Sequence, residues 1–159
     1  MSRTHARSLR GTRAIVSEPF QRGQNISVIG SLGLDGAGPT MAIEGAVDAV
    51  VFETYVEFFL VPTLCLDDIV VLDNVQFHHS ARARQLIEAA GAKVLHLPTY
   101  SPDFNPIEEC ISKIKAILRS LKARTKRQLL NALAKALTKI TIDDICGWFL
   151  DCGYVYSFI

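Results

Sequence analysis

Residues 69–109, IVVLDNVQFHHSARARQLIEAAGAKVLHLPTYSPDFNPIEE, decide the fold of this chain. The stretch opens with four apolar residues, Ile69 to Leu72, a run that is typical of a strand buried on both faces. A helix at residues 81–90, a stop at Gly91 and a second strand at residues 93–97 follow. Strand, helix and strand in this order predict a right-handed crossover, which sets the two strands parallel in one sheet.

Two carboxylates, Asp73 and Glu108, stand at the ends of regular elements in this unit. Asp73 follows the first strand, and ligand groups in open α/β sheets gather at the carboxyl ends of strands. Glu108 lies in the first turn of a helix that begins at Asn105 and Pro106. Each acid also has a structural alternative, because Asp73 with Asn74 can turn the chain and Glu108 can complete a capping box. If the two acids converge, their oxygen atoms suit Mg²⁺, which keeps open positions for phosphate and water.

Two motifs in the same stretch resemble a known family. The pattern DN-x₃-H runs from Asp73 to His78, and residues 97–109 read LPTYSPDFNPIEE. Together they resemble the DDE-type catalytic domain of mariner-like transposases and their bacterial insertion-sequence relatives, from about residue 25 to the C-terminus. The resemblance implies an α/β, ribonuclease-H-like mixed sheet flanked by helices, with Asp73 as the second acid of a triad and Glu108 as the third. Thr99 and Phe104 replace a proline and a leucine that are common in the family, and we expect neither to touch a proposed ligand.

The resemblance also implies a function, which is metal-dependent DNA cleavage by an endonuclease followed by strand transfer during DNA transposition. The resemblance further implies two bound Mg²⁺ or Mn²⁺ ions. Asp73 would bridge the two ions, and Glu108 would bind one of them. His78 and Asn74 are candidate DNA contacts, although a solvated loop is an equal alternative for His78. The expected partners are DNA and a second copy of the chain, forming a dimer on the DNA.

The first acid of the family's triad, an aspartate on the first strand, has no counterpart after Met1. Asp35 lies in the turn LDGAG, and Asp48 begins a helix, where the helix dipole explains an acid. We therefore expect the first strand to be missing, and the chain to be a truncated or split-reading-frame product. An upstream transposase polypeptide would then complete the triad. The alternative is a catalytically dead remnant that only binds DNA or a partner chain.

Positive and negative charges are segregated along the chain. Residues 1–24 carry five arginines against one acid, Glu18, and we interpret them as a basic N-terminal segment before a catalytic domain at residues 25–159. Residues 110–142 contain lysine and arginine but no acid. Three of these cations share a helical face with Glu108, and they form a candidate DNA-guiding ridge: Lys115, Arg119 and Lys122. The alternative is that the helical cations are only a solvated face.

The remaining pattern predicts a single-domain protein. Residues 25–34 and 39–47 read as a hairpin joined by DGAG, and residues 49–61 as a helix with an apolar inner face, formed by Val50, Phe52, Tyr55, Val56 and Phe59. Further helices are predicted from Glu108 to about Arg124, from near Thr125, and at residues 142–151. His96 is predicted to be a core residue whose ring nitrogens are satisfied by hydrogen bonds.

The four cysteines fit no zinc pair or disulfide framework, and no apolar stretch is free enough of charge to span a membrane. A cytoplasmic location is therefore expected.

Overall fold

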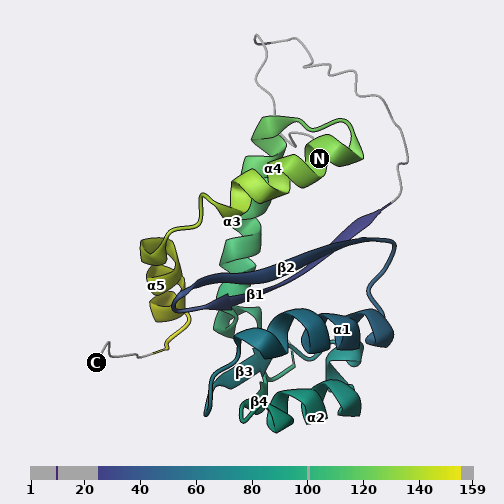
Figure 1. Cartoon of the computed structure of the whole chain (residues 1–159). Coiled ribbons are helices and arrows are strands. Elements are labelled where there is room, and N and C mark those ends of the chain that lie inside the picture. Colours follow the sequence, from purple (N-terminus) through teal and green to yellow (C-terminus); the bar gives the residue numbers. More distant parts are fainter. Residues whose placement is uncertain (1–9, 11–24, 100, 155–159) are drawn as a thin grey trace.

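The computed structural model describes Arg10, residues 25–99 and residues 101–154. It has an α/β fold in which helices pack on two small sheets (Figure 1). β1 (Ile26–Gly33) pairs antiparallel with β2 (Gly36–Glu44), and β3 (Ile69–Leu72) pairs in parallel with β4 (Lys93–His96). Within the described residues the two pairs are not hydrogen-bonded to each other, so the mixed sheet expected from the resemblance occurs as two halves. The basic segment predicted at residues 1–24 lies outside the described residues except for Arg10.

The β1–β2 hairpin turns earlier than the glycine pattern predicts. Only Leu34 and Asp35 lie between the two strands, and β2 already begins at Gly36. Gly36 has a φ of 150°, a backbone conformation that residues with a side chain rarely adopt. The turn therefore depends on this glycine, and Asp35 is a turn residue as predicted.

α1 (Ala49–Tyr55) begins at Asp48, whose side chain accepts the N–H of Val51 at 2.9 Å. The helix continues as a π-helical turn (Val56–Leu60) and a short 3₁₀ turn (Val61–Thr63). Of its predicted inner face, three residues are buried and two are not: Phe52, Tyr55 and Val56 are buried, whereas Val50 is 68% and Phe59 38% exposed. Val50 is about 200° from Phe52 on a helical wheel, so it faces away from the core.

α1 and α2 (Ala81–Ala89) cover the same face of the β3–β4 pair. Val56 and Ile87 are fully buried there, against Val70 from the strand side. The opposite face of β3 is open, because Ile69 is 62% and Val71 36% exposed. The prediction that this strand is buried on both faces was therefore wrong for the part of the chain that the structure describes.

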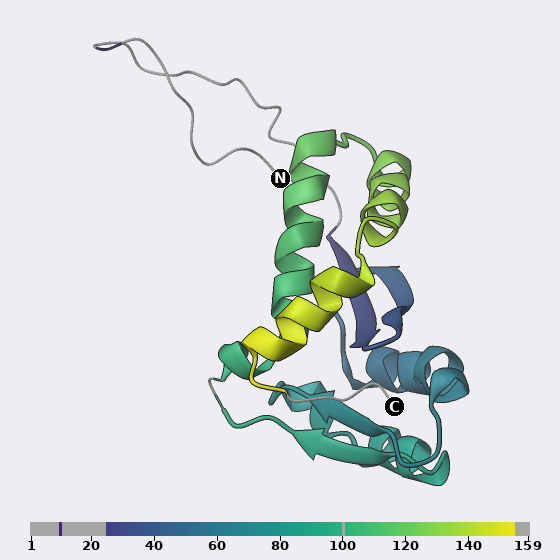
Figure 2. The ribbon, with the colours of Figure 1, turned by 90° about the vertical axis from the view of Figure 1, so that its left-hand side faces the viewer.

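The C-terminal half contains α3 (Pro106–Leu121), α4 (Lys126–Leu137) and α5 (Ile142–Asp151). Figure 2 shows α5 crossing α3, and an ion pair between Lys113 and Asp144 joins the two helices. α3 is shorter than predicted, because Lys122 adopts a left-handed conformation with φ 48° and ends it before Arg124. Among the described residues, no helix is both long and apolar enough to cross a bilayer.

Candidate active site

Asp73 lies at the carboxyl end of β3, where the chain turns into a short 3₁₀ helix (Gln76–His79). Its Oδ1 atom accepts the backbone N–H of Val75 at 3.2 Å and the Nδ1–H of His78 at 2.5 Å. The turn-forming alternative for Asp73 is therefore realised, but it occupies only one carboxylate oxygen. The Oδ2 atom makes no hydrogen bond to another described residue, and the side chain remains 41% exposed.

Glu108 lies in the first turn of α3, which begins in the way the sequence predicts. Asn105 is the N-cap, its side chain accepts the N–H of Ile107 at 3.4 Å, and Pro106 occupies the first turn. A capping box forms at the start of α4 and α5 but not at the start of α3. Glu108 is exposed, and its carboxylate forms no hydrogen bond within the described part of the chain. The carboxylate is therefore available to a ligand.

The two acids line one cavity of about 360 Å³, although they are far apart in the sequence. Asn74 and Asn105 lie in the same lining together with apolar residues such as Leu97, so carboxylate, amide and apolar groups border the cavity. Thr99 also lines it. This threonine stands where the resembled family commonly has proline.

A polar network supports the turn after Asp73. Asn74 donates through Nδ2 to the hydroxyl of Thr99 at 3.2 Å, and its Oδ1 accepts from Nε2 of His79 at 2.5 Å. The His79 ring stacks on His96 with centroids 4.5 Å apart. Sequence reasoning missed the roles of His79 and Thr99, although the five-residue step from Asp73 to His78 is repeated from Asn74 to His79.

His96 differs from its prediction as a satisfied core residue. It is only partly buried, and its buried Nδ1 atom has no hydrogen-bond partner among the described residues. The register of the parallel pair sets His96 opposite Leu72, directly before Asp73, which brings the ring to the edge of the site. Sequence alone could not place it there, because the register of two strands is a long-range property.

The candidate DNA-guiding ridge is only partly helical. Lys115 and Arg119 are exposed on α3, on the same side of the helical wheel as Glu108. Lys122 is exposed but lies beyond the end of the helix. The neighbouring Lys113 has a structural role instead, because it pairs with Asp144.

The Asp144 carboxylate has a strongly shifted pKa. The hydrogen bond from Lys113, and those from the N–H and hydroxyl of Thr141, lower this pKa from 3.8 to about 2. Burial acts in the opposite direction and is outweighed. The ionised form of Asp144 therefore joins α3, which carries Glu108, to α5.

The donor set of the cavity fits a hard divalent cation, because carboxylate oxygens are the ligands that Mg²⁺ prefers. It supplies two of the three acids that the resemblance implies. No three histidine, cysteine, aspartate or glutamate side chains in the described ranges are grouped closely enough to hold a metal ion. Asp48 is used as a helix cap and Asp35 as a turn residue, so neither replaces the first acid.

Two comparisons with known proteins show similarities. The family model described as "DDE superfamily endonuclease" matches residues 1–130 and so includes the basic segment. Among solved structures, the chain is similar to one in the "Crystal structure of the Mos1 Strand Transfer Complex", with a TM-score of 0.73 and 16% sequence identity. The match covers 98% of this chain and 51% of that chain, so this chain spans about half its length. No curated protein matches the sequence. Because the family model matches well over half of its residues, the chain belongs to the DDE superfamily endonucleases.

Proposed function

We propose that this chain is the catalytic part of a DNA transposase of the insertion-sequence type. It would cleave a phosphodiester bond in DNA and transfer the strand, with Asp73 and Glu108 as ligands of Mg²⁺ or Mn²⁺. The observation that carries this proposal is the cavity that Asp73 and Glu108 line together. If Asp73 only formed a turn and Glu108 only capped its helix, the two side chains would not need to line the same cavity. Two carboxylates that line one cavity can share a cation.

The chain's own residues divide the work in a definite way. A bound divalent cation would supply Lewis-acid activation of water or a 3′-hydroxyl, and charge stabilisation at the leaving oxygen. Asp73 is held in place by His78 and by the N–H of Val75, so its ligand oxygen is positioned before the cation arrives. Asn74 is a candidate contact to DNA, and its orientation is fixed by Thr99.

DNA would approach along α3. Lys115 and Arg119 are exposed on the helix that presents Glu108, and Lys122 follows at its end. Cations in this position can neutralise backbone phosphates, which gives affinity without base recognition. The Mos1 structure is that of a strand transfer complex, and its similarity to this chain supports the same function here. A dimer on DNA is the assembly that we expect.

A second candidate function is DNA binding without cleavage. The observation that favours it is that only two acids meet at the cavity within the described residues. A remnant of this kind would keep the basic surface but would not bind the catalytic cations.

Binding of Mn²⁺ separates these two functions. The electron paramagnetic resonance signal of free Mn²⁺ falls when the ion binds, so a titration gives the affinity of the chain. We expect Asp73→Asn and Glu108→Gln each to weaken binding by tenfold or more, which is about 1.4 kcal/mol or more per ligand. Glu109→Gln is the matched control, because Glu109 is exposed in the same turn but does not line the cavity.

DNA binding of the wild type and of the three variants is measured by a gel shift in the absence of metal. A chain that shifts DNA while its Mn²⁺ affinity is insensitive to Asp73→Asn and Glu108→Gln would be the binding-only remnant. A chain that loses Mn²⁺ in both variants but not in Glu109→Gln has the proposed metal site.

A further inference from the structure

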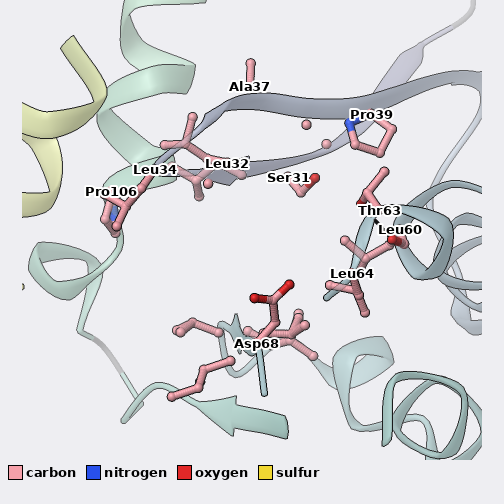
Figure 3. A pocket seen from close by; sticks show the side chains of 18 of the residues that line it. Ser31, Leu32, Leu34, Ala37, Pro39, Leu60, Thr63, Leu64, Asp68 and Pro106 are labelled. Carbon is pink, nitrogen blue, oxygen red and sulfur yellow. Dashed lines mark hydrogen bonds between the residues drawn. The ribbon is translucent and has the colours of Figure 1, made fainter. Parts of the chain in front are cut away.

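The start of α3 borders a cavity of about 830 Å³ that lies between the β1–β2 hairpin and β3 (Figure 3). Figure 3 shows Pro106 at the border of this space, and Asn105 and Ile107 also line it. Because open space rather than packed side chains borders the helix start here, contacts from other elements matter more for its position. The same contacts then govern the turn at residues 101–105, which leads into Glu108.

A residue just after α5 supplies such a contact. The hydroxyl of Tyr154 donates a hydrogen bond to the backbone carbonyl of Phe104 at 2.9 Å, although the two residues are 50 positions apart in the sequence. Among the described residues, this is the only hydrogen bond that joins residues 101–105 to a distant part of the chain. The turn before α3 is therefore held from α5.

Tyr154 is itself held in place by α5. Its N–H donates to the carbonyl of Phe149 at 2.9 Å, and the two rings lie with their centroids 5.5 Å apart. Burial raises the pKa of the Tyr154 phenol, and the neighbouring Cys152 raises it further. The hydroxyl therefore keeps its proton at neutral pH and can act as the donor to Phe104.

α5 also contacts the start of α3 at other points. Burial raises the pKa of the Cys152 thiol, and so do nearby carboxylates, among them Glu109 and Asp103. Glu109 belongs to the first turn of α3 and Asp103 to the turn before it, so the end of α5 lies close to both. Near the beginning of α5, Asp144 pairs with Lys113. α5 is thus joined to α3 near both of its own ends.

The carbonyl that Tyr154 binds is well placed to affect Glu108. It belongs to the peptide unit that links Phe104 to Asn105, and a peptide unit is planar, so the hydrogen bond also restricts the orientation of Asn105. The Asn105 carbonyl accepts the N–H of Glu108 at 3.1 Å, and its side chain accepts the N–H of Ile107 at 3.4 Å. Asn105 and Glu108 both line the cavity that contains the candidate metal ligands.

We propose that Tyr154 is a positioning residue for Glu108. Its hydrogen bond to Phe104 holds the N-cap of α3, and the N-cap holds the Glu108 carboxylate on the cavity that it shares with Asp73. The use of that carboxylate as a metal ligand rests on the proposed function. The restraint on the turn stands independently of it.

Hydrogen exchange tests the restraint without any metal. Tyr154→Phe removes the hydroxyl and keeps the ring that packs on Phe149. The N–H groups of Phe104 and Glu108, which bond within the turn and the N-cap, should then exchange about two- to tenfold faster, the usual effect of losing one hydrogen bond. The N–H of Ile87 in the α1–α2 core should exchange at its wild-type rate, which shows that the whole fold has not been weakened.

Tyr55→Phe is the matched control. The Tyr55 hydroxyl donates to a backbone carbonyl in the same way, to Pro39 at 2.8 Å, but this bond joins α1 to β2. The variant therefore loses the same kind of hydrogen bond at a place that does not hold α3. Exchange at Phe104 and Glu108 should be unaltered in it.

The Mn²⁺ titration tests whether the restraint reaches the carboxylate. Tyr154→Phe should weaken Mn²⁺ binding about two- to tenfold in the wild type and again in the Asp73→Asn background, because Glu108 is present in both. Combined with Glu108→Gln it should cause no further loss. A general disturbance of the cavity would instead lower the affinity in all three backgrounds, and Tyr55→Phe should lower it in none.

The outcomes separate this proposal from the proposed function. Unaltered exchange at Phe104 and Glu108 in Tyr154→Phe would overturn the proposal. So would faster exchange with no change in a Glu108-dependent Mn²⁺ affinity, or an equal loss of affinity in the Glu108→Gln background. If exchange becomes faster but Mn²⁺ binding of the wild type does not depend on Asp73 or Glu108, the restraint on the turn stands and the proposed metal function fails.

Discussion

His78 holds Asp73 at the carboxyl end of β3, with His78 Nδ1 2.5 Å from Asp73 Oδ1. The His78 ring itself packs against Phe52, with centroids 4.5 Å apart, so the contact connects the core to the candidate ligand. Groups that orient a metal ligand in this way often matter nearly as much as the ligand. The contact gives a structural role to the histidine five residues after Asp73. From the sequence alone, a solvated loop position was an equal alternative for His78.

We predict that His78→Ala lowers the affinity for Mn²⁺ about tenfold, because Asp73 loses the group that orients it. The measurement is the same Mn²⁺ titration by electron paramagnetic resonance. His79→Ala is the matched control, since His79 bonds to Asn74 and not to Asp73. Equal losses in the two variants would mean that general disruption of the turn, and not the His78–Asp73 contact, governs affinity.

The pairing of Asp144 with Lys113 predicts a dependence of stability on pH. The pKa of Asp144 is lower in the folded chain, about 2, than its ordinary 3.8, so the ionised form stabilises the fold. This contribution is complete above about pH 5 and is lost as the pH falls from there toward 2. Urea unfolding of the wild type between pH 2 and 6 should show that loss, whereas Asp144→Asn should lack this part of the pH dependence. Parallel curves for the two proteins would contradict the assignment.

Ile87 is expected to contribute strongly to the stability of the α1–α2 core, because it is fully buried. Ile87→Ala should lower the free energy of unfolding by about 2–5 kcal/mol, through lost burial and the cavity left behind. Val50→Ala is the control, since Val50 is 68% exposed. Chemical denaturation measures both changes, and a large loss in Val50→Ala would indicate that its predicted inward orientation had been correct after all.

The ridge of Lys115, Arg119 and Lys122 should contribute to the salt dependence of DNA affinity. If all three contact phosphates, changing them together to alanine makes the slope of log K against log[salt] shallower by about three units. Lys93→Ala is the comparison, because Lys93 pairs with Asp67 and begins β4, at the end of the sheet away from Asp73. An unaltered slope in the triple variant would leave the ridge as a solvated face.

The local pattern of the sequence was sufficient to predict the β3–α2–β4 unit. The apolar runs, the helix between them and Gly91 all act over short distances, and β3, α2 and β4 formed within a residue or two of the predicted bounds. The convergence of Asp73 and Glu108 on one cavity was one of two open alternatives, because the sequence also allowed Glu108 to cap its own helix.

Features that depend on distant contacts were not predictable from the pattern. The exposed face of β3 at Ile69 and Val71 depends on both covering helices packing on the same side. The stacking of His79 on His96 depends on the strand register. The division into two half-sheets depends on how the β1–β2 hairpin is placed relative to β3, which no local propensity specifies.

Anomalous diffraction from crystals soaked in Mn²⁺ tests the shared metal site most directly, because it locates the ion without relying on activity. Our account predicts an anomalous peak in the cavity within roughly 2.0–2.6 Å of carboxylate oxygens from both Asp73 and Glu108, the range of Mg²⁺ and Ca²⁺ ligand distances. The Glu109→Gln crystal should show the same peak, and the Asp73→Asn crystal should lack it. Manganese bound by only one of the two acids, or outside the cavity altogether, would contradict the account.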